Sequence, residues 1–432
     1  MKDLNKSTYG LYLSSFFCMK IDALTYGESM TEREISLFIH EYVHYLQSFT
    51  TIYGLERIYS DFSVLTNAVG WVRTQVNPIV PVPLSENILN VISGNAHLIS
   101  ELIWGDREYI SHIQITNVDI DNIKIDEQCQ VESVSLSLKN ESGDESFCTF
   151  GAREIYEGMA YLIEQYITKD YEYSPDHPYC TAEKVANHIC PHLLDDRRNL
   201  LVLCDKALMS SNPGPEFVRI IEWLSQVHYL PPTPDDLFYF LDSNWETYDL
   251  DQKTGVIETF VKRVEFIKAN LHSLLQDDLF SDYHIWLDAI FDYAIDLRKT
   301  EPMFWLDIVD NGYVKDNLYF QAILHFAGSP LIETVKHEYF TVDPEGSYSE
   351  SMSFFRVFYQ IYKLLVEGKN QCELMPWCNN SPNAVRIDET CYKCPWKHKE
   401  DNGELCPFKS IWQHWGLNDI EVTQQDSTHK RQ

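Results

Sequence analysis

The residues His40-Glu41-Tyr42-Val43-His44 form an HExxH pattern, whose residue types and spacing point to metal chemistry. On a helix, side chains four residues apart lie on one face, so His40 and His44 can present two imidazole nitrogens to one ion. Glu41 would lie beside them, close enough to hold a zinc-bound water without being a ligand. Zinc lowers the pKa of such a water and the carboxylate takes its proton, which is the chemistry of a metallohydrolase.

The pattern lies inside a well-marked helix. Thr31 and Glu34 have the spacing of a capping box, which places the helix start at Thr31, and Gly54 is expected to end the helix. Burying two imidazoles and a carboxylate without partners is costly, so a metal site is favoured over a polar surface stripe. The apolar residues that recur at helical spacing are Ile35, Phe38, Ile39, Tyr42, Val43 and Leu46.

A catalytic zinc takes a third protein ligand and leaves its fourth position open to water. Three glutamates lie on the next clear helix, predicted to begin at Gly151. Glu157 is the predicted ligand, because the small residues after it would let the two helices approach closely. Glu154 is expected to cap the start of the helix, where a carboxylate suits the helix dipole, and Glu164 is a more distant alternative. Tyr161, His325 and His337 are equal candidates for stabilising an oxyanion.

The motif HEYVH with the downstream YEGMA resembles the gluzincin branch of HExxH zinc metallopeptidases. The resemblance covers about residues 9–170 and implies a zincin-like core with His40, His44 and Glu157 as ligands and Glu41 as general base. It also implies that the apolar segment from Tyr9 to Ile21 is an edge strand that pairs with an extended substrate. The 112 residues between His44 and Glu157 exceed the usual spacing, so they must contain an inserted unit.

The pattern along the chain predicts an α+β fold that is predominantly α. Alternating segments from about 108 to 150 predict a β-rich insertion, with a turn at residues 140–143, whereas the three prolines of residues 77–85 indicate a loop. We expect four parts: a zincin-like core with its insertion, a mainly helical domain completing the cleft, a cysteine-rich zinc-ribbon-like module and a polar tail. Their predicted ranges are 1–170, 171–370, 371–415 and 420–432.

A second metal site is predicted near the C-terminal end. Its cysteines follow the pattern Cys372-x5-Cys378-x12-Cys391-x2-Cys394-x11-Cys406, with one CxxC pair. Cys378, Cys391, Cys394 and Cys406 are the predicted ligands of a structural zinc, and Cys372 is the alternative to Cys378. An iron–sulfur cluster and free thiols are the other interpretations.

Composition narrows the functional class. Lys and Arg number 34 against 65 Asp and Glu, a net charge of −31, which argues against nucleic acid and anionic membranes as partners. The chain shows no secretory signal and no apolar run long enough to span a bilayer, and its 11 cysteines are an odd count. We therefore expect a cytoplasmic zinc metallopeptidase acting on a protein or peptide. The alternatives are a non-catalytic interaction protein on a zincin scaffold and a zinc hydrolase of a non-peptide amide.

Overall fold

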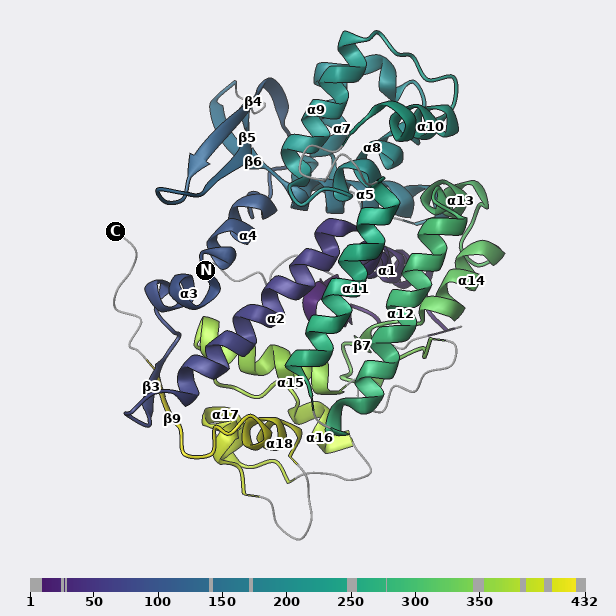
Figure 1. The fold of residues 1–432 in the computed structure, drawn as a ribbon. Coiled ribbons are helices and arrows are strands. Elements are labelled where there is room, and N and C mark those ends of the chain that lie inside the picture. The colour runs from purple at the N-terminus through teal and green to yellow at the C-terminus, as the bar shows by residue number, and fades with distance from the viewer. Residues whose placement is uncertain are drawn as a thin grey trace.

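Helices dominate the protein, as the sequence predicts, and the strands form small sheets, of which β4–β6 stands at the upper left of Figure 1. The computed structural model describes residues 10–24, 27, 29–139, 143–170, 174–246, 255–276, 278–344, 353–380, 386–399 and 406–424. Within these ranges no helix combines the length and the hydropathy that crossing a bilayer requires.

Helix α1 (Glu32–Thr50) carries the HExxH pattern at the centre of the molecule. The predicted capping box is present: the Thr31 hydroxyl accepts from the Glu34 amide, and the Glu34 carboxylate accepts from the Thr31 amide at 2.8 Å. From Phe38 onward every residue of α1 is buried, so this is a core helix rather than a surface one. It packs against α2 (Ile52–Arg73), α5 (Ala152–Ile167) and α12 (Ser281–Thr300).

The expectation that Gly54 ends the helix is wrong. Helix α1 ends at Thr50, and Thr51 then caps α2 by accepting from the Gly54 amide at 3.0 Å. Gly54 lies in the first turn of α2, where a Cβ would stand 2.4 Å from the Gln47 carbonyl oxygen. Glycine is needed here because it lets α2 turn back directly against α1.

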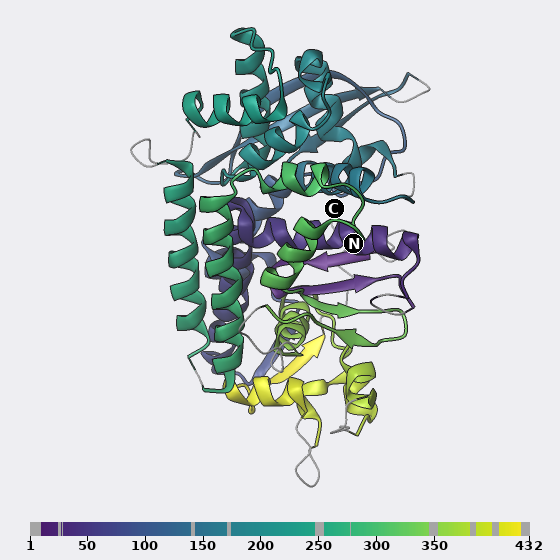
Figure 2. The same cartoon turned by 90° about the vertical axis from the view of Figure 1, so that its right-hand side faces the viewer.

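The segment expected as one strand from Tyr9 to Ile21 forms a hairpin, with Tyr9 itself outside the described residues. Strands β1 (Gly10–Leu13) and β2 (Cys18–Ile21) pair antiparallel across a short 3-10 turn, Ser14–Phe16, followed by Phe17 at a φ of 45°. Strand β2 also pairs in parallel with β7 (Leu331–Glu333), and β7 pairs with β8 (Tyr339–Phe340). Strand β1 is therefore the edge of this sheet among the described strands, and it runs alongside α1 (Figure 2).

The predicted β-rich insertion is present as a three-stranded antiparallel sheet. It consists of β4 (Gln114–Lys124), β5 (Gln130–Lys139) and β6 (Glu145–Phe150), in that order. Residues 140–142 of the expected turn lie outside the described residues. Strand β6 leads through Gly151 into α5, so the insertion returns the chain to the centre at the helix that carries Glu157.

One strand pair joins distant parts of the chain. The segment expected as a loop contains β3 (Ile79–Val82), which pairs in parallel with β9 (Glu421–Gln424). Part of the expected polar tail is thus a strand, while residues 425–432 lie outside the described residues. The remaining helices are α3 (Glu86–Ser93), α4 (Ala96–Trp104), α6 (Asp176–Tyr179), α7 (Thr181–Ile189), α8 (Asn199–Leu208), α9 (Pro213–Gln226), α10 (Pro234–Asn244), α11 (Val256–Leu274), α13 (Phe304–Asp310), α14 (Leu318–Ala327), α15 (Ser353–Tyr362), α16 (Met375–Asn380), α17 (Glu389–Lys393) and α18 (Pro407–His414).

The turn between α1 and α2 gives a test of this packing. Gly54→Ala should destabilise the protein by about 1–3 kcal/mol, because the added methyl group meets backbone atoms that cannot move aside. Gly70→Ala is the matched control on the same helix, where a Cβ would meet no atom within 4 Å. It should stabilise by about 0.5–1 kcal/mol. Urea midpoints measure both changes, and equal shifts would contradict the close approach at Gly54.

Candidate metal centre

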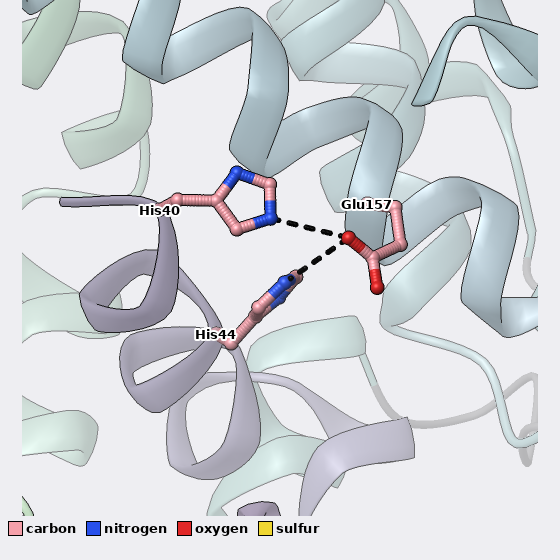
Figure 3. Close-up of side chains that lie close together, drawn as sticks. All are labelled: His40, His44 and Glu157. Carbon is pink, nitrogen blue, oxygen red and sulfur yellow. Dashed lines mark hydrogen bonds and ion pairs between the residues drawn. The ribbon is translucent and has the colours of Figure 1, made fainter. Parts of the chain in front are cut away.

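Two helices bring His40, His44 and Glu157 together (Figure 3). His40 and His44 project from successive turns of α1, and Glu157 faces them from α5, which packs against α1. The Glu157 Oε2 atom lies 3.1 Å from His40 Nε2 and 3.5 Å from His44 Nε2. One ligand atom from each residue thus lies within 4.8 Å of the other two.

These distances fit a zinc ion. Ligand atoms about 2.1 Å from zinc at tetrahedral angles stand about 3.4 Å from one another, close to the two spacings observed. Two imidazoles and one carboxylate are a donor set that catalytic zinc sites use. The side chain of Glu157 is 18% exposed and those of the two histidines 11%, so the centre is enclosed but still reaches solvent.

Each histidine is held at its other nitrogen. His40 Nδ1 lies 3.1 Å from Glu164 Oε2, and that carboxylate also accepts from the Ser36 hydroxyl. His44 Nδ1 lies 2.8 Å from Gln47 Oε1. These bonds turn both Nε2 atoms toward Glu157, as partners of metal-bound histidines commonly do.

Glu164, expected only as a distant alternative ligand, is therefore a partner of His40. It lies two helical turns beyond Glu157, on the same face of α5. The sequence analysis missed Gln47, although its position three residues after His44 signals a shared helix face.

The centre is built for positive charge. Burial alone would lower the pKa of His40, but hydrogen bonds to Glu157 and Glu164 raise it well above its usual value. Burial would raise the pKa of Glu157, yet hydrogen bonds from His40 and His44 hold it well below its usual range. The two carboxylates therefore favour a cation between the helices.

Glu41 lies beside the centre and against strand β1. It is buried, and burial raises the pKa of its carboxyl to about 7, although the nearby His44 and His40 act to lower it. A Cβ on Gly10 would stand 2.4 Å from Glu41 Oε1. Because Gly10 has no side chain, the backbone of the edge strand can pass directly over the carboxylate.

Glu154 caps α5, as expected. Its Oε2 accepts from the Gly151 amide at 2.7 Å, and the side chain is fully buried. Its Oε1 lies 3.7 Å from His177 Nε2, but burial raises the pKa of Glu154 to about 8 and lowers that of His177 to about 4. Near neutral pH both groups are uncharged, so this contact is not an ion pair.

The three residues considered for oxyanion stabilisation are engaged in other contacts. The Tyr161 phenol hydrogen-bonds to Gln165 and to the Ser174 backbone. His337 binds Glu333 Oε1 at 2.8 Å, and His325 lies exposed on α14 against Phe326.

Tyr179, which the sequence analysis missed, lies at the centre instead. Its ring packs edge-on against His40, with centroids 5.8 Å apart. Burial raises the pKa of the Tyr179 phenol, and the charges of Glu157 and Glu41 raise it further, so the hydroxyl keeps its proton near both carboxylates. Tyr109 packs beside it, with centroids 6.4 Å apart. No motif marks either tyrosine among the 26 in the chain.

The cysteine-rich segment contains a second group of metal-ligating side chains. Asp388, Cys391 and His398 each place one ligand atom within 4.8 Å of the others. Cys391 is the member of the predicted set in this group, and His398 was not anticipated. The other predicted cysteines lie nearby in sequence, with Cys378 on α16, Cys394 directly after α17 and Cys406 directly before α18; none of them forms a disulfide with another described cysteine.

No protein-family model, no curated protein and no solved structure matches this chain.

The contact between His40 Nδ1 and Glu164 Oε2 can be tested for its effect on metal binding. Glu164→Gln should weaken zinc binding about 10-fold, because the ring loses a charged partner that orients it. Competition with a chromophoric chelator measures the affinity. Glu154→Gln is the matched control, a buried glutamate on the same helix that bonds Gly151 and should leave zinc affinity unchanged. Equal affinities in wild type and Glu164→Gln would contradict the positioning role.

Proposed function

We propose that the chain is a zinc-dependent metallopeptidase of the gluzincin type. The observation that carries the proposal is the convergence of His40, His44 and Glu157 beside the buried Glu41. Three protein ligands leave one position of a tetrahedral zinc free, which distinguishes a catalytic site from a closed structural one. A zinc ion there would supply a Lewis acid and lower the pKa of a water bound to it.

In this proposal, Glu41 is the general base. Its carboxylate sits next to the two histidine ligands but is not itself in the ligand group, which leaves it free to accept a proton. The positive charge of a bound cation would lower its pKa from the value set by burial, favouring the carboxylate form. After the carbonyl is attacked, the protonated Glu41 would deliver its proton to the leaving amine.

Tyr179 is the proposed oxyanion donor. Its hydroxyl lies in the field of Glu41 and Glu157 and stays protonated at neutral pH, so it can donate to an oxygen that gains negative charge. The packing of its ring on His40 ties it to the ligands rather than to the surface. Tyr109 packs against the Tyr179 ring, so a second tyrosine lies beside the proposed donor.

The edge strand supports a peptide as the substrate. Strand β1 has a free edge among the described strands and passes over Glu41 at Gly10. An extended peptide can add to such an edge through main-chain hydrogen bonds. That addition would hold a scissile carbonyl near the general base. The same features argue against a non-catalytic scaffold. Such a protein would need neither a buried Glu41 nor a residue without a side chain, Gly10, next to the Glu41 carboxylate.

Replacing the general base tests the peptidase proposal. Glu41→Gln should keep its zinc but lose roughly 10²–10⁴ in rate, because proton transfer is removed while the ligands remain. New N-termini produced in a peptide library or cell lysate, with zinc content measured on the same samples, provide the readout. Glu32→Gln is the control on the same helix, where Glu32 binds Lys315 at the surface. Identical cleavage by wild type and Glu41→Gln would exclude this peptidase mechanism.

A separate substitution tests the oxyanion donor. Tyr179→Phe should lower kcat about 10²–10³-fold with little change in KM or zinc content, because the hydroxyl acts only as charge develops. Tyr161→Phe is the matched control, since the Tyr161 hydroxyl bonds to Gln165 and Ser174. The assignment fails if both variants lose the same activity or if Tyr179→Phe loses none.

A further inference from the structure

The cysteine-rich segment gathers buried metal-ligating side chains far from the α1–α5 interface in sequence. Cys372, Cys378, Cys391 and Cys406 are each 5–8% exposed, and His398 is fully buried. None of these cysteines forms a disulfide with another described cysteine. They come from α16, α17 and the residues around them, at the lower end of the molecule in Figure 1. Burying so many thiols beside an imidazole is typical of a small metal-stabilised unit.

Two of these side chains already have the spacing of a shared metal ion. His398 Nδ1 lies 3.8 Å from Cys391 Sγ. A thiolate about 2.3 Å and an imidazole about 2.0 Å from zinc, at a tetrahedral angle, stand about 3.5 Å apart. The observed distance therefore fits ligands of one zinc ion within a few tenths of an ångström.

One of the two ring nitrogens of the buried His398 has no hydrogen-bond partner in the described structure. Its Nδ1 has a distant contact with Thr390 Oγ1 at 3.3 Å, and its Nε2 is buried with no hydrogen-bond partner in the described structure. Leaving a buried nitrogen without a partner is unfavourable. Nδ1 is the nitrogen that faces Cys391 Sγ and the Thr390 and Asp388 oxygens, so it is the atom placed to bind an ion together with Cys391.

Asp388 is better explained as a helix cap beside His398 than as a ligand of the metal ion. Its Oδ1 accepts from the Thr390 amide at 2.7 Å and from the Thr390 hydroxyl, and so caps α17. The same atom lies 3.6 Å from His398 Nδ1. The thiols are the softer donors available, and a structural zinc prefers them.

We propose that Cys391 and His398 bind a structural zinc ion, with two of the buried thiols Cys372, Cys378 and Cys406 completing the site. The Cys372 amide bonds to the Cys391 carbonyl at 2.9 Å, which joins the first cysteine to α17. Cys378 lies on α16 and Cys406 lies directly before α18, and both side chains are buried like that of Cys372. Cys394 is left out because it is only partly buried.

The site would stabilise the end of the chain against the rest of the protein. Helix α18 packs on α15, and strand β9, which follows it, pairs with β3. These segments are short, and α16 and α17 have only six and five residues, too few to be stable alone. A zinc ion among them would supply the stability that so small a core lacks.

Metal analysis of the full chain tests the assignment. Wild type should contain two zinc ions per chain if both centres fill. Cys391→Ser and His398→Ala should each lose the zinc of the cysteine-rich segment. His40→Ala should lose the zinc of the α1–α5 centre, and the control Cys394→Ser should retain both. Cobalt substitution gives a second readout that does not depend on activity. The thiolate-to-cobalt absorption should weaken in Cys391→Ser and persist in His40→Ala, provided that circular dichroism shows each variant folded.

Three results would overturn the proposal. Zinc lost in Cys394→Ser but kept in His398→Ala would replace this ligand set with the CxxC pair. Iron with visible absorption instead of zinc would identify a cluster. Full metal retention in both Cys391→Ser and His398→Ala would leave only free thiols. Because His40→Ala is scored separately, none of these results bears on the α1–α5 centre.

Discussion

Burial of ionisable side chains between α1 and α5 is the constraint on which the rest of the structure depends. His40, His44, Glu41 and Glu164 are each less than a tenth exposed, and Glu157 faces the two histidines. Charges so placed are costly unless each has a partner, and here every ligand has one. The pairing holds the side chains in position before any ion arrives, which is what a precise metal site requires.

The surrounding elements can be understood as supports for that interface. Gly54 brings α2 against the far end of α1, and Gly10 brings β1 against Glu41, each by the absence of a side chain. The β-sheet insertion lies between α1 and α5 in the sequence. Helix α5 then begins directly after Gly151, whose amide donates to the capping carboxylate of Glu154. The long spacing that sets this chain apart from the gluzincin pattern therefore leaves the geometry of the triad intact.

Features set by residues close together in the sequence could be predicted from it, whereas contacts between distant segments could not. The capping box at Thr31, the spacing of His40 and His44, and the small residues beside Glu157 were enough to anticipate α1 and the helix facing it, because each signal lies within a few turns. The β3–β9 pair, Tyr179 and His398 depend on chain segments that meet only in the fold. Alternation alone also could not show that residues 9–21 bend into a hairpin rather than run as one strand.

The parallel pairing of β2 with β7 has a consequence for synthesis. Cys18 lies opposite Leu331, so more than 300 residues separate the two strands. At about 5–20 residues per second, a ribosome would make the helices α1 and α5 on the order of 10–30 s before β7 emerges. The ligands would exist well before the sheet beside Glu41 has its inner partner. For the proposed peptidase, this order means that the edge strand proposed to bind the substrate is fixed in its sheet only near the end of translation.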